Sequence, residues 1–339
     1  MPDTSAQHAP VASRVRSRQP VRPRGPAWMR SVLVPVAVAV AIGTIFIGVY
    51  LSAFHAPTAR GLPVAVVSSD RAATVAARLS RQSPDTFRVQ AVPDRETART
   101  AVARGEVYAA YVPGHATAEL LFAGAHGPGV KTLVVRAFGA AAHAGGERLT
   151  AVDVVPASPR DANGLVVFYT TFGLVLAGYL FGIMTFQFGP GLTTGRRLLS
   201  LAAFGGAGGL TVAAVVAAFD VLPAPFFGVA GLVALVAMAV GASTMLLVRT
   251  LGALGSSAAA VVFMTVGNAT SGGSLPPDFL PVWLKPFSAV LPVGVGVRAV
   301  NGLAYFHGDG IISGIAVLTA WTGFGIGGLI LRQRVSRRA

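Results

Sequence analysis

The chain has 339 residues, of which 53% are hydrophobic and 12% are charged, and its mean hydropathy is +0.65. Soluble domains carry about a quarter charged residues, so this composition excludes an ordinary soluble protein. The net charge of +14 could indicate nucleic-acid binding, but most of the excess borders apolar runs, and no nucleic-acid partner is expected. The absence of cysteine excludes disulfides, thiolate metal sites and a cysteine nucleophile.

The N-terminal end predicts a tail followed by a membrane helix. Residues 1–30 are basic with few apolar side chains, so a disordered cytoplasmic tail is expected there. Residues 31–54 contain an uncharged apolar run long enough to cross the bilayer core. A cleaved signal peptide is the alternative. It fits less well, because its apolar region would be only about 7–15 residues long and Ala56–Ala59 is a poor cleavage site.

Residues 55–163 predict a small α/β domain with a partly parallel sheet, because short strands alternate with helices. Strands are expected at 62–67, 87–92, 107–112, 119–122 and 149–155. Helices are expected after caps at Ser68–Asp70 and Asp94, and at about 130–142. Between Arg60 and Asp161 lie 12 of the 27 basic residues and nine of the 13 acidic residues of the chain. This part therefore has the charge content of a soluble domain.

This domain predicts no catalytic, cofactor or metal site. His55, His115, His126 and His143 lack the short spacings of metal ligands, so surface or loop histidines are expected. The glycines around His126 do not form a phosphate-binding pattern, and no Gly-x-Ser-x-Gly nucleophile motif is present. Because no acid, base and nucleophile converge, an enzyme is not expected.

Residues 164–331 predict five more transmembrane helices, at 165–187, 198–219, 226–248, 251–268 and 310–331. The helix at 251–268 is the shortest and is rich in Gly, Ala and Ser. A basic tail, residues 332–339, follows the last helix. The predicted fold is therefore an all-α membrane bundle of six transmembrane helices with an inserted α/β domain.

Arginine positions predict the orientation, because arginines collect in cytoplasmic loops beside membrane helices. Arginines precede the first helix and follow the last, and others follow the second and fourth helices, at Arg196, Arg197 and Arg249. Acidic residues Asp220, Asp278 and Asp309 fall on the opposite side. Both termini are thus expected in the cytoplasm and the α/β domain outside it, in a multi-pass protein of a bacterial plasma membrane.

Small residues predict close helix packing through three Gly-x-x-x-Gly pairs, at Gly178 and Gly182, Gly205 and Gly209, and Gly323 and Gly327. Packing inside one bundle is the first interpretation, and a homodimer face is the alternative. The predicted spans contain few ionisable residues near their centres, which argues against an ion-coupled carrier.

Residues 275–304 predict two short outer helices, either re-entrant or interfacial. Prolines at 276, 281, 286 and 292 prevent one continuous helix, although the segment is too apolar for a free loop. Irregular backbone at membrane depth must be buried in protein or face a watery cavity. A translocation vestibule and a simple lid over the bundle both satisfy this condition.

The stretch Asn-x-x-Ser-Gly-Gly-x-x-Pro-Pro at 268–277, the later Leu-Pro-x-Gly, and Asn301 and Phe306 together resemble the ABC-2 type permease superfamily. The order of one span, an outer α/β domain and five spans is similar to the YhgE/Pip (phage infection protein) and DUF3533 branch, over residues 31–331. This resemblance implies re-entrant or translocation-path roles for a set of polar, glycine and proline residues: Asn268, Gly272, Gly273, Pro276, Pro277, Pro292 and Gly294.

The resemblance also implies the membrane subunit of an export system for a lipid-like, hydrophobic or polymeric substrate. A separate cytoplasmic subunit would hydrolyse ATP, in keeping with the lack of a Gly-x-x-x-x-Gly-Lys-Ser/Thr loop in this chain. The loop at 188–200, with Arg196 and Arg197, would dock that partner. The alternative is a non-transporting membrane protein, either a secretion accessory factor or a cell-surface anchor.

Overall fold

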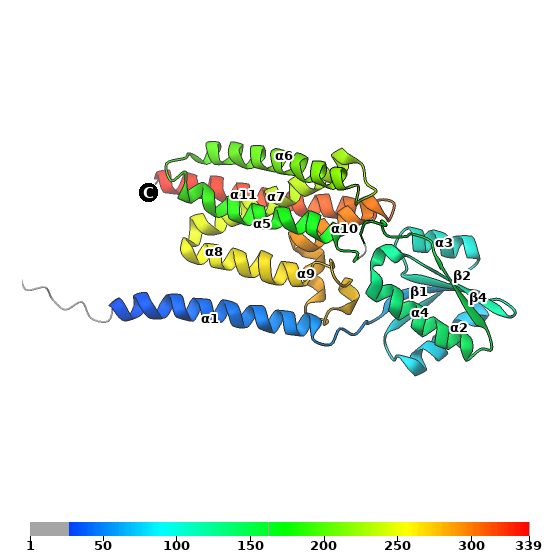
Figure 1. The fold of residues 1–339 in the computed structure, drawn as a ribbon. Coiled ribbons are helices and arrows are strands. Elements are labelled where there is room, and N and C mark those ends of the chain that lie inside the picture. The colour runs from blue at the N-terminus through cyan, green and yellow to red at the C-terminus, as the bar shows by residue number, and fades with distance from the viewer. Residues whose placement is uncertain (1–26, 162, 339) are drawn as a thin grey trace, which may run out of the picture. The chain divides into compact units, whose positions relative to one another are not determined.

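The computed structural model describes residues 27–161 and 163–338, and these residues are mostly helical (Figure 1). Within them, five helices are long and apolar enough to cross a membrane. The chain is therefore a multi-pass membrane protein. It divides into two compact units, Met1–Ala41 and Ile42–Ala339. Most of the tail predicted at 1–30 lies outside the described residues, and its last four residues belong to the first helix.

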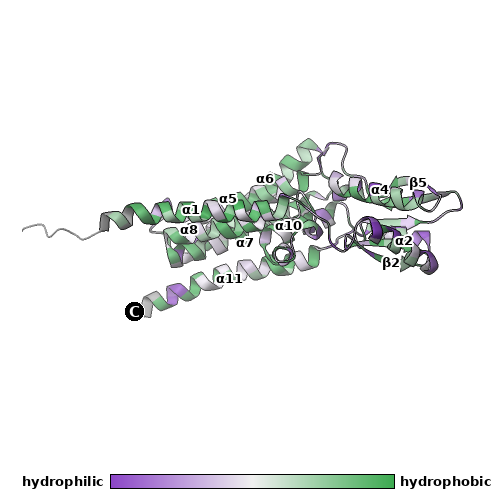
Figure 2. Cartoon of the chain, turned by 90° about the horizontal axis from the view of Figure 1, so that it is seen from below, coloured by the Kyte–Doolittle hydropathy of each residue, from purple (hydrophilic) through white to green (hydrophobic). Residues whose placement is uncertain are grey.

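The five long helices are α1 (Ala27–Phe54), α5 (Val166–Gln187), α6 (Thr194–Phe219), α7 (Phe226–Leu251) and α11 (Ile311–Arg338). Figure 2 shows hydrophobic residues along most of α5 and α7, and hydrophilic residues in the last turns of α11. The most buried is α7, because α5, α6 and α11 all pack against it. The predicted basic tail after residue 331 continues α11 instead of leaving it.

The predicted span at 251–268 is shorter than expected. It consists of α8 (Ala253–Ala259) and a π-helical continuation, η2 (Ala260–Gly267). This helix falls below the about 17 residues that cross a bilayer core. The structure therefore supports five candidate spans, and a sixth crossing through this segment remains a prediction.

Two of the three predicted glycine pairs lie against α7. A Cβ atom at Gly178 of α5 would stand 2.7 Å from the carbonyl oxygen of Ala237, and one at Gly205 of α6 would stand 2.6 Å from Met238 Cγ. Their partners Gly182 and Gly209 also have α7 atoms within this range. Glycine is needed at these positions because α5 and α6 approach α7 too closely for a side chain.

The third glycine pair, Gly323 and Gly327, does not lie against α7. A Cβ atom at Gly323 or Gly327 would meet open space among the described residues. On α11 it is Gly325 and Gly328 that approach α7, at Ala242 and Leu246. The sequence spacing alone does not show which side of a helix faces its neighbour. A packing role for Gly323 and Gly327 therefore remains a prediction, and it would involve another molecule.

The strands form one mixed sheet of order β2-β1-β3-β4-β5 in the described chain. Their bounds are β1 (Leu62–Val67), β2 (Phe87–Val92), β3 (Ala109–Val112), β4 (Thr117–Phe122) and β5 (Arg148–Asp153). Only β3 and β4 pair in antiparallel fashion, and the other neighbours are parallel. The prediction of a partly parallel sheet is confirmed.

Helices cover both faces of the sheet. On one face lie α2 (Ser69–Gln82) and α4 (Pro128–His143), and on the other lies α3 (Arg95–Ala103) (Figure 1). The side chains of β1 alternate between them, with Val64 facing α2 and α4 and Ala65 facing α3. Both residues are fully buried, so β1 is a core strand.

The predicted helix caps are partly right. The Asp94 carboxylate accepts a hydrogen bond of 2.8 Å from the Thr97 amide, and this bond lowers the pKa of Asp94 below its ordinary value. Ser68 occupies the cap position of α2, but its side chain makes no capping hydrogen bond to the described residues. Its φ of 84° turns the chain sharply from β1 into α2 instead.

The segment at 268–309, called the junction segment below, links η2 to α11. It contains a 3-10 turn, η3 (Pro277–Phe279), and two short helices, α9 (Lys285–Val290) and α10 (Pro292–Ala304). Each begins with a proline in its first turn, where the missing N–H costs no hydrogen bond. The predicted pair of short helices is present.

The glycine geometry yields a paired test. Replacing Gly178→Leu is expected to destabilise the detergent-solubilised protein by about 1–3 kcal/mol, because the side chain must displace the α7 backbone. Gly323→Leu should change stability by about 0.5 kcal/mol or less in the monomer. Thermal unfolding of the two variants checks this, and equal losses would contradict the packing described here.

Candidate functional site at the junction of sheet and helices

The junction segment reaches into the sheet through Phe306, which lies between α10 and α11. This side chain is 4% exposed and belongs to the apolar cluster on the α3 face, with Val102 and Leu121. Gly105 has a φ of +71°, and a Cβ atom there would stand 3.1 Å from the Phe306 ring. Glycine therefore serves both the turn after α3 and the space for the ring.

A second aromatic side chain enters the opposite face. Phe279 of η3 is 8% exposed and belongs to the cluster that β1, α2 and α4 form. Leu275, just before η3, packs against the same cluster. The junction segment thus holds the sheet by both faces through apolar contacts.

Asp278, next to Phe279 in the chain, adds polar contacts between the junction segment and the sheet part. Its Oδ2 accepts a hydrogen bond of 2.9 Å from the Tyr108 hydroxyl of the sheet part. Its Oδ1 accepts one of 2.5 Å from Lys285 Nζ, and its carbonyl oxygen accepts one of 3.0 Å from the Arg60 amide. Burial, and then the nearby Asp278 charge, raise the pKa of Tyr108 well above its ordinary value, so this hydroxyl remains a donor.

His126 lies where these contacts meet. Its ring stacks on Phe306 at 4.4 Å between centroids and lies 4.5 Å from the ring of Tyr108. Its Nε2 is shielded from solvent and has no hydrogen-bond partner among the described residues. Burial lowers the pKa of His126 to about 4, although the charges of Asp278 and Asp309 oppose this. His126 lies in the η1 turn (Gly124–His126) and is partly exposed as a residue, so it is a loop histidine, as predicted, although its Nε2 is shielded.

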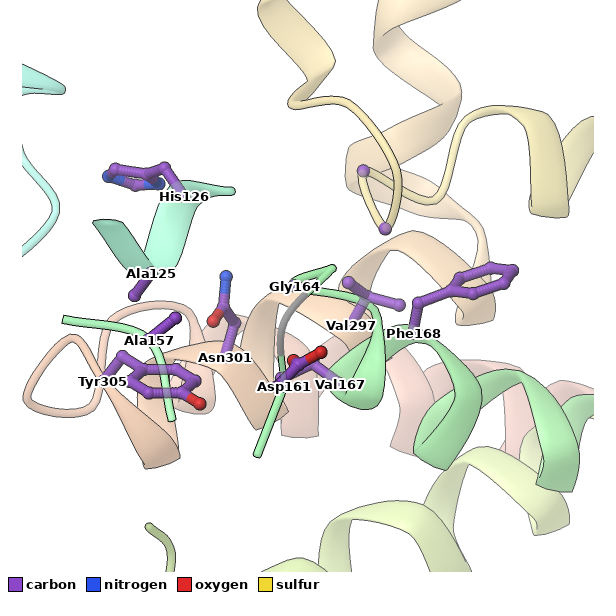
Figure 3. Close-up of a pocket in the computed structure, with 12 residues that line it drawn as sticks. Ala125, His126, Ala157, Asp161, Gly164, Val167, Phe168, Val297, Asn301 and Tyr305 are labelled. Atoms are coloured by element: carbon purple, nitrogen blue, oxygen red, sulfur yellow. The ribbon is translucent and has the colours of Figure 1, made fainter. Parts of the chain in front are cut away.

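A small cavity of about 30 Å³ lies beside His126 (Figure 3). It is lined by side chains from the η1 turn (Gly124–His126), the start of α5, and the end of α10, among them Asn301 and Tyr305. Asp161 is 8% exposed and accepts hydrogen bonds of 2.9 and 3.1 Å from the amides of Leu165 and Val166 at the start of α5. The volume accommodates about one water molecule, not a large substrate.

The predicted re-entrant residues separate into two groups. Gly272 and Gly273 line this cavity, and a Cβ atom at Gly273 would collide with the Phe168 ring. Gly272 has a φ of +75°, and Pro277 packs close to it. Pro276 is buried and directly precedes η3.

The other predicted residues lie elsewhere in the junction segment. Asn268 donates a hydrogen bond of 2.7 Å from Nδ2 to the Tyr50 hydroxyl of α1. Pro292 and Gly294 are buried in the first turn of α10, where a Cβ atom at Gly294 would collide with the Ser288 backbone. These three residues do not line the cavity, and each has a structural contact of its own.

Arg197 is a buried residue, 5% exposed. Its guanidinium donates hydrogen bonds to the carbonyl oxygens of Thr185 and Gly189, and it lies 4.0 Å from the centre of the Phe186 ring. It therefore closes the connection between α5 and α6. Arg196 is exposed and is the one of the two predicted docking arginines that remains accessible.

Charged residues divide between the two ends of α5, α6, α7 and α11. An apolar cluster that includes Leu201, Met245 and Leu329 brings the Arg196, Arg249 and Arg332 ends of these helices together. Arg332 also donates a hydrogen bond of 3.5 Å to the Thr250 carbonyl oxygen. At the sheet end, acidic residues pair with basic ones: Asp220 with Arg160, Asp278 with Lys285, and Asp309 with Arg298.

Comparison of the chain with protein-family models, curated proteins and solved structures finds no match. The site must therefore be interpreted from its own residues. In the described ranges, no group of three or more His, Cys, Asp or Glu side chains is placed to hold a metal ion.

Sequence reasoning missed the central residues of this site. Tyr108, His126 and Asp278 come from positions up to 170 residues apart. No local motif joins such positions. Phe306, which contacts His126, was named in the sequence only as part of the resemblance.

The depressed pKa of His126 predicts acid sensitivity. A histidine with a pKa of about 4 in the folded protein and 6.5 when exposed favours folding above pH 6.5, and this stability is lost as the pH falls towards 4. His126→Phe keeps the ring contacts and removes the titration, so its unfolding temperature should fall less between about pH 7 and pH 5. His115→Gln, at an exposed position, is the control and should behave like the wild type. An unchanged pH dependence in His126→Phe would contradict the assignment.

Proposed function

We propose that this chain is the membrane-spanning permease subunit of an ABC-2-like export system in a bacterial plasma membrane. The observation that carries the proposal is the junction segment. It places helix α10, with nine of its residues buried, among α5, α7 and α11, and it holds the sheet part by both faces. In this proposal the broken, buried segment at one end of the helix bundle forms the gate of the substrate path.

The charge division supports an orientation. Arg196, Arg249 and Arg332 collect at the end remote from the sheet, and cytoplasmic ends of membrane helices are rich in arginine. The sheet part would then be an extracytoplasmic domain inserted after α1. Both termini would lie in the cytoplasm.

The short α8–η2 helix is the proposed fifth of six crossings. Gly255 at its start lies against Leu247 at the arginine end of α7, and Asn268 at its end bonds to Tyr50. Beyond η2 the chain continues as irregular backbone through the buried residues Thr270 and Ser271. Irregular backbone is tolerated at membrane depth when protein surrounds it, so a short helix completes the crossing.

Energy for transport would come from a separate cytoplasmic ATP-binding subunit. The long helices contain few ionisable groups that could form a proton or ion pathway. Arg196, which is exposed in the first turn of α6, is the proposed docking contact. The substrate is proposed to be lipid-like, hydrophobic or polymeric, and a homodimer through the open Gly323–Gly327 side of α11 would fit this arrangement.

A second candidate is a non-transporting membrane protein, either a secretion accessory factor or a cell-surface anchor. The small size of the cavity at the junction favours it, because about 30 Å³ does not admit a transported molecule. In that case the apolar contacts of Phe279 and Phe306 would serve only to hold the sheet part at the membrane surface.

Cysteine labelling tests the orientation, since the chain has no native cysteine. Single cysteines at the exposed or partly exposed positions Ser83 and Ser274 should react with a membrane-impermeant maleimide on intact cells. A cysteine at Gly195, beside the proposed docking contact, should react only after permeabilisation. Labelling of the Gly195 position from outside would contradict the proposed topology.

Purification in mild detergent tests the permease assignment. An ATP-binding subunit should copurify with the chain, and the chain should stimulate its ATPase activity. Arg196→Glu should weaken copurification because it reverses the charge of the docking contact, whereas Arg136→Glu, on the exposed side of α4, should not. If no ATP-binding protein copurifies with the folded chain, the permease assignment is contradicted, and the accessory or anchor function becomes the better assignment.

A further inference from the structure

A cleft of about 770 Å³ opens between α3 of the sheet part and the loop that joins α10 to α11. We call it the basic cleft, and its defining residues are Arg99, Arg104 and His307. Its volume lies within the range of about 300–1,000 Å³ that is typical of small-molecule sites. The small cavity beside His126 is separate from it, and Tyr305 lines both.

Positive charge dominates the lining. Among the described residues, two arginines and a histidine line the basic cleft and no acidic residue does. The guanidinium of Arg99 is 3.7 Å from Glu96, and that of Arg104 is 3.9 Å from Glu106. Both ion pairs are long, and both arginine side chains are more than half exposed, at 54% and 62%. Such pairs contribute little, so both guanidinium groups can turn to an anion.

Another part of the lining is apolar, and its backbone is held by hydrogen bonds. Val154 and Val155 line it, just after β5. The Val154 amide donates a hydrogen bond of 2.8 Å to Phe122, and the Val155 carbonyl oxygen accepts one of 3.0 Å from Ala125. The basic cleft therefore combines an apolar part with a hydrogen-bonded backbone and a part with exposed cationic side chains.

The position of the basic cleft relates it to the ends of the membrane helices. Tyr305 and His307 lie in the loop directly before α11, a helix of spanning length. The neighbouring Arg298 and Asp309 pair at 3.0 Å, which holds this loop. Phospholipid head groups occur at the same depth as the ends of membrane helices.

We propose that the basic cleft binds the phosphate group of an amphiphile, with Arg99 and Arg104 around the phosphate oxygens and Val154 and Val155 along its apolar part. Guanidinium groups suit this role because they donate two parallel hydrogen bonds to phosphate oxygens. The ligand is a phosphate ester with net negative charge, which phosphatidylcholine lacks, and its source is either a lipid head group or a soluble phosphate compound. The proposal deepens the permease function by naming a site for an anionic lipid-like substrate, but the binding itself requires neither an ATPase nor transport.

The test uses the full chain in neutral detergent, with phosphatidylglycerol, phosphatidylcholine and inorganic phosphate as probes. Native mass spectrometry is expected to detect retained phosphatidylglycerol. Arg99→Gln combined with Arg104→Gln should weaken this binding at least about tenfold, because it removes the charge-assisted hydrogen bonds to the phosphate oxygens. The control is Arg81→Gln combined with Arg88→Gln, which removes the same charge from exposed positions of the sheet part outside the cleft.

The outcomes are distinguishable. Binding that is lost only in the cleft variant and is not displaced by inorganic phosphate supports a lipid source, and displacement by inorganic phosphate supports a soluble one. Equal weakening in the control pair, equal retention of phosphatidylcholine, or no retention by the wild type would overturn the proposal. Unchanged unfolding temperatures of both variants exclude misfolding as the cause. A negative result in the lipid-binding experiment does not change the result of the copurification experiment. The binding proposal and the permease proposal are therefore tested separately.

Discussion

The insertion of Phe306 into the α3 face of the sheet is the contact on which the arrangement of this protein depends. The ring is 4% exposed, lies against a glycine turn and stacks on His126. Burying an aromatic side chain contributes roughly 1.5–3 kcal/mol, which is large for one residue. Because Phe306 directly follows α10 and precedes α11, this contact connects the sheet part to two helices at once.

The contacts around Phe306 make the connection specific in direction as well as strong. Phe279 enters the other face of the sheet, and Asp278 joins Tyr108 and Lys285 beside it. Apolar contacts alone would tolerate sliding, whereas a partly buried carboxylate with defined donors sets one position. A displacement of the junction segment would therefore break contacts with the sheet part.

Sequence reasoning succeeded where local pattern decides structure. The alternating and apolar runs at 62–67 and 87–92 became β1 and β2 with the predicted bounds, and long uncharged runs became α5, α6 and α7 within a few residues. It was less accurate at 251–268, where a Gly- and Ser-rich apolar run became a short helix with a π-helical end. Hydropathy measures only the preference of a segment for lipid. It does not predict where tertiary packing ends a helix, as it does in the segment at 251–268.

The sequence by itself determined the membrane class, the mixed α/β character of the sheet part and the division of charge between the two ends. These properties follow from composition and short-range periodicity, which do not depend on distant residues. Only the tertiary structure decided that His126 Nε2 is shielded from solvent, that Arg197 is enclosed, that Gly325 rather than Gly323 meets α7, and that Arg99 and His307 share a cleft. Each of these depends on which side of an element faces a neighbour far away in the chain, and that choice is made by packing.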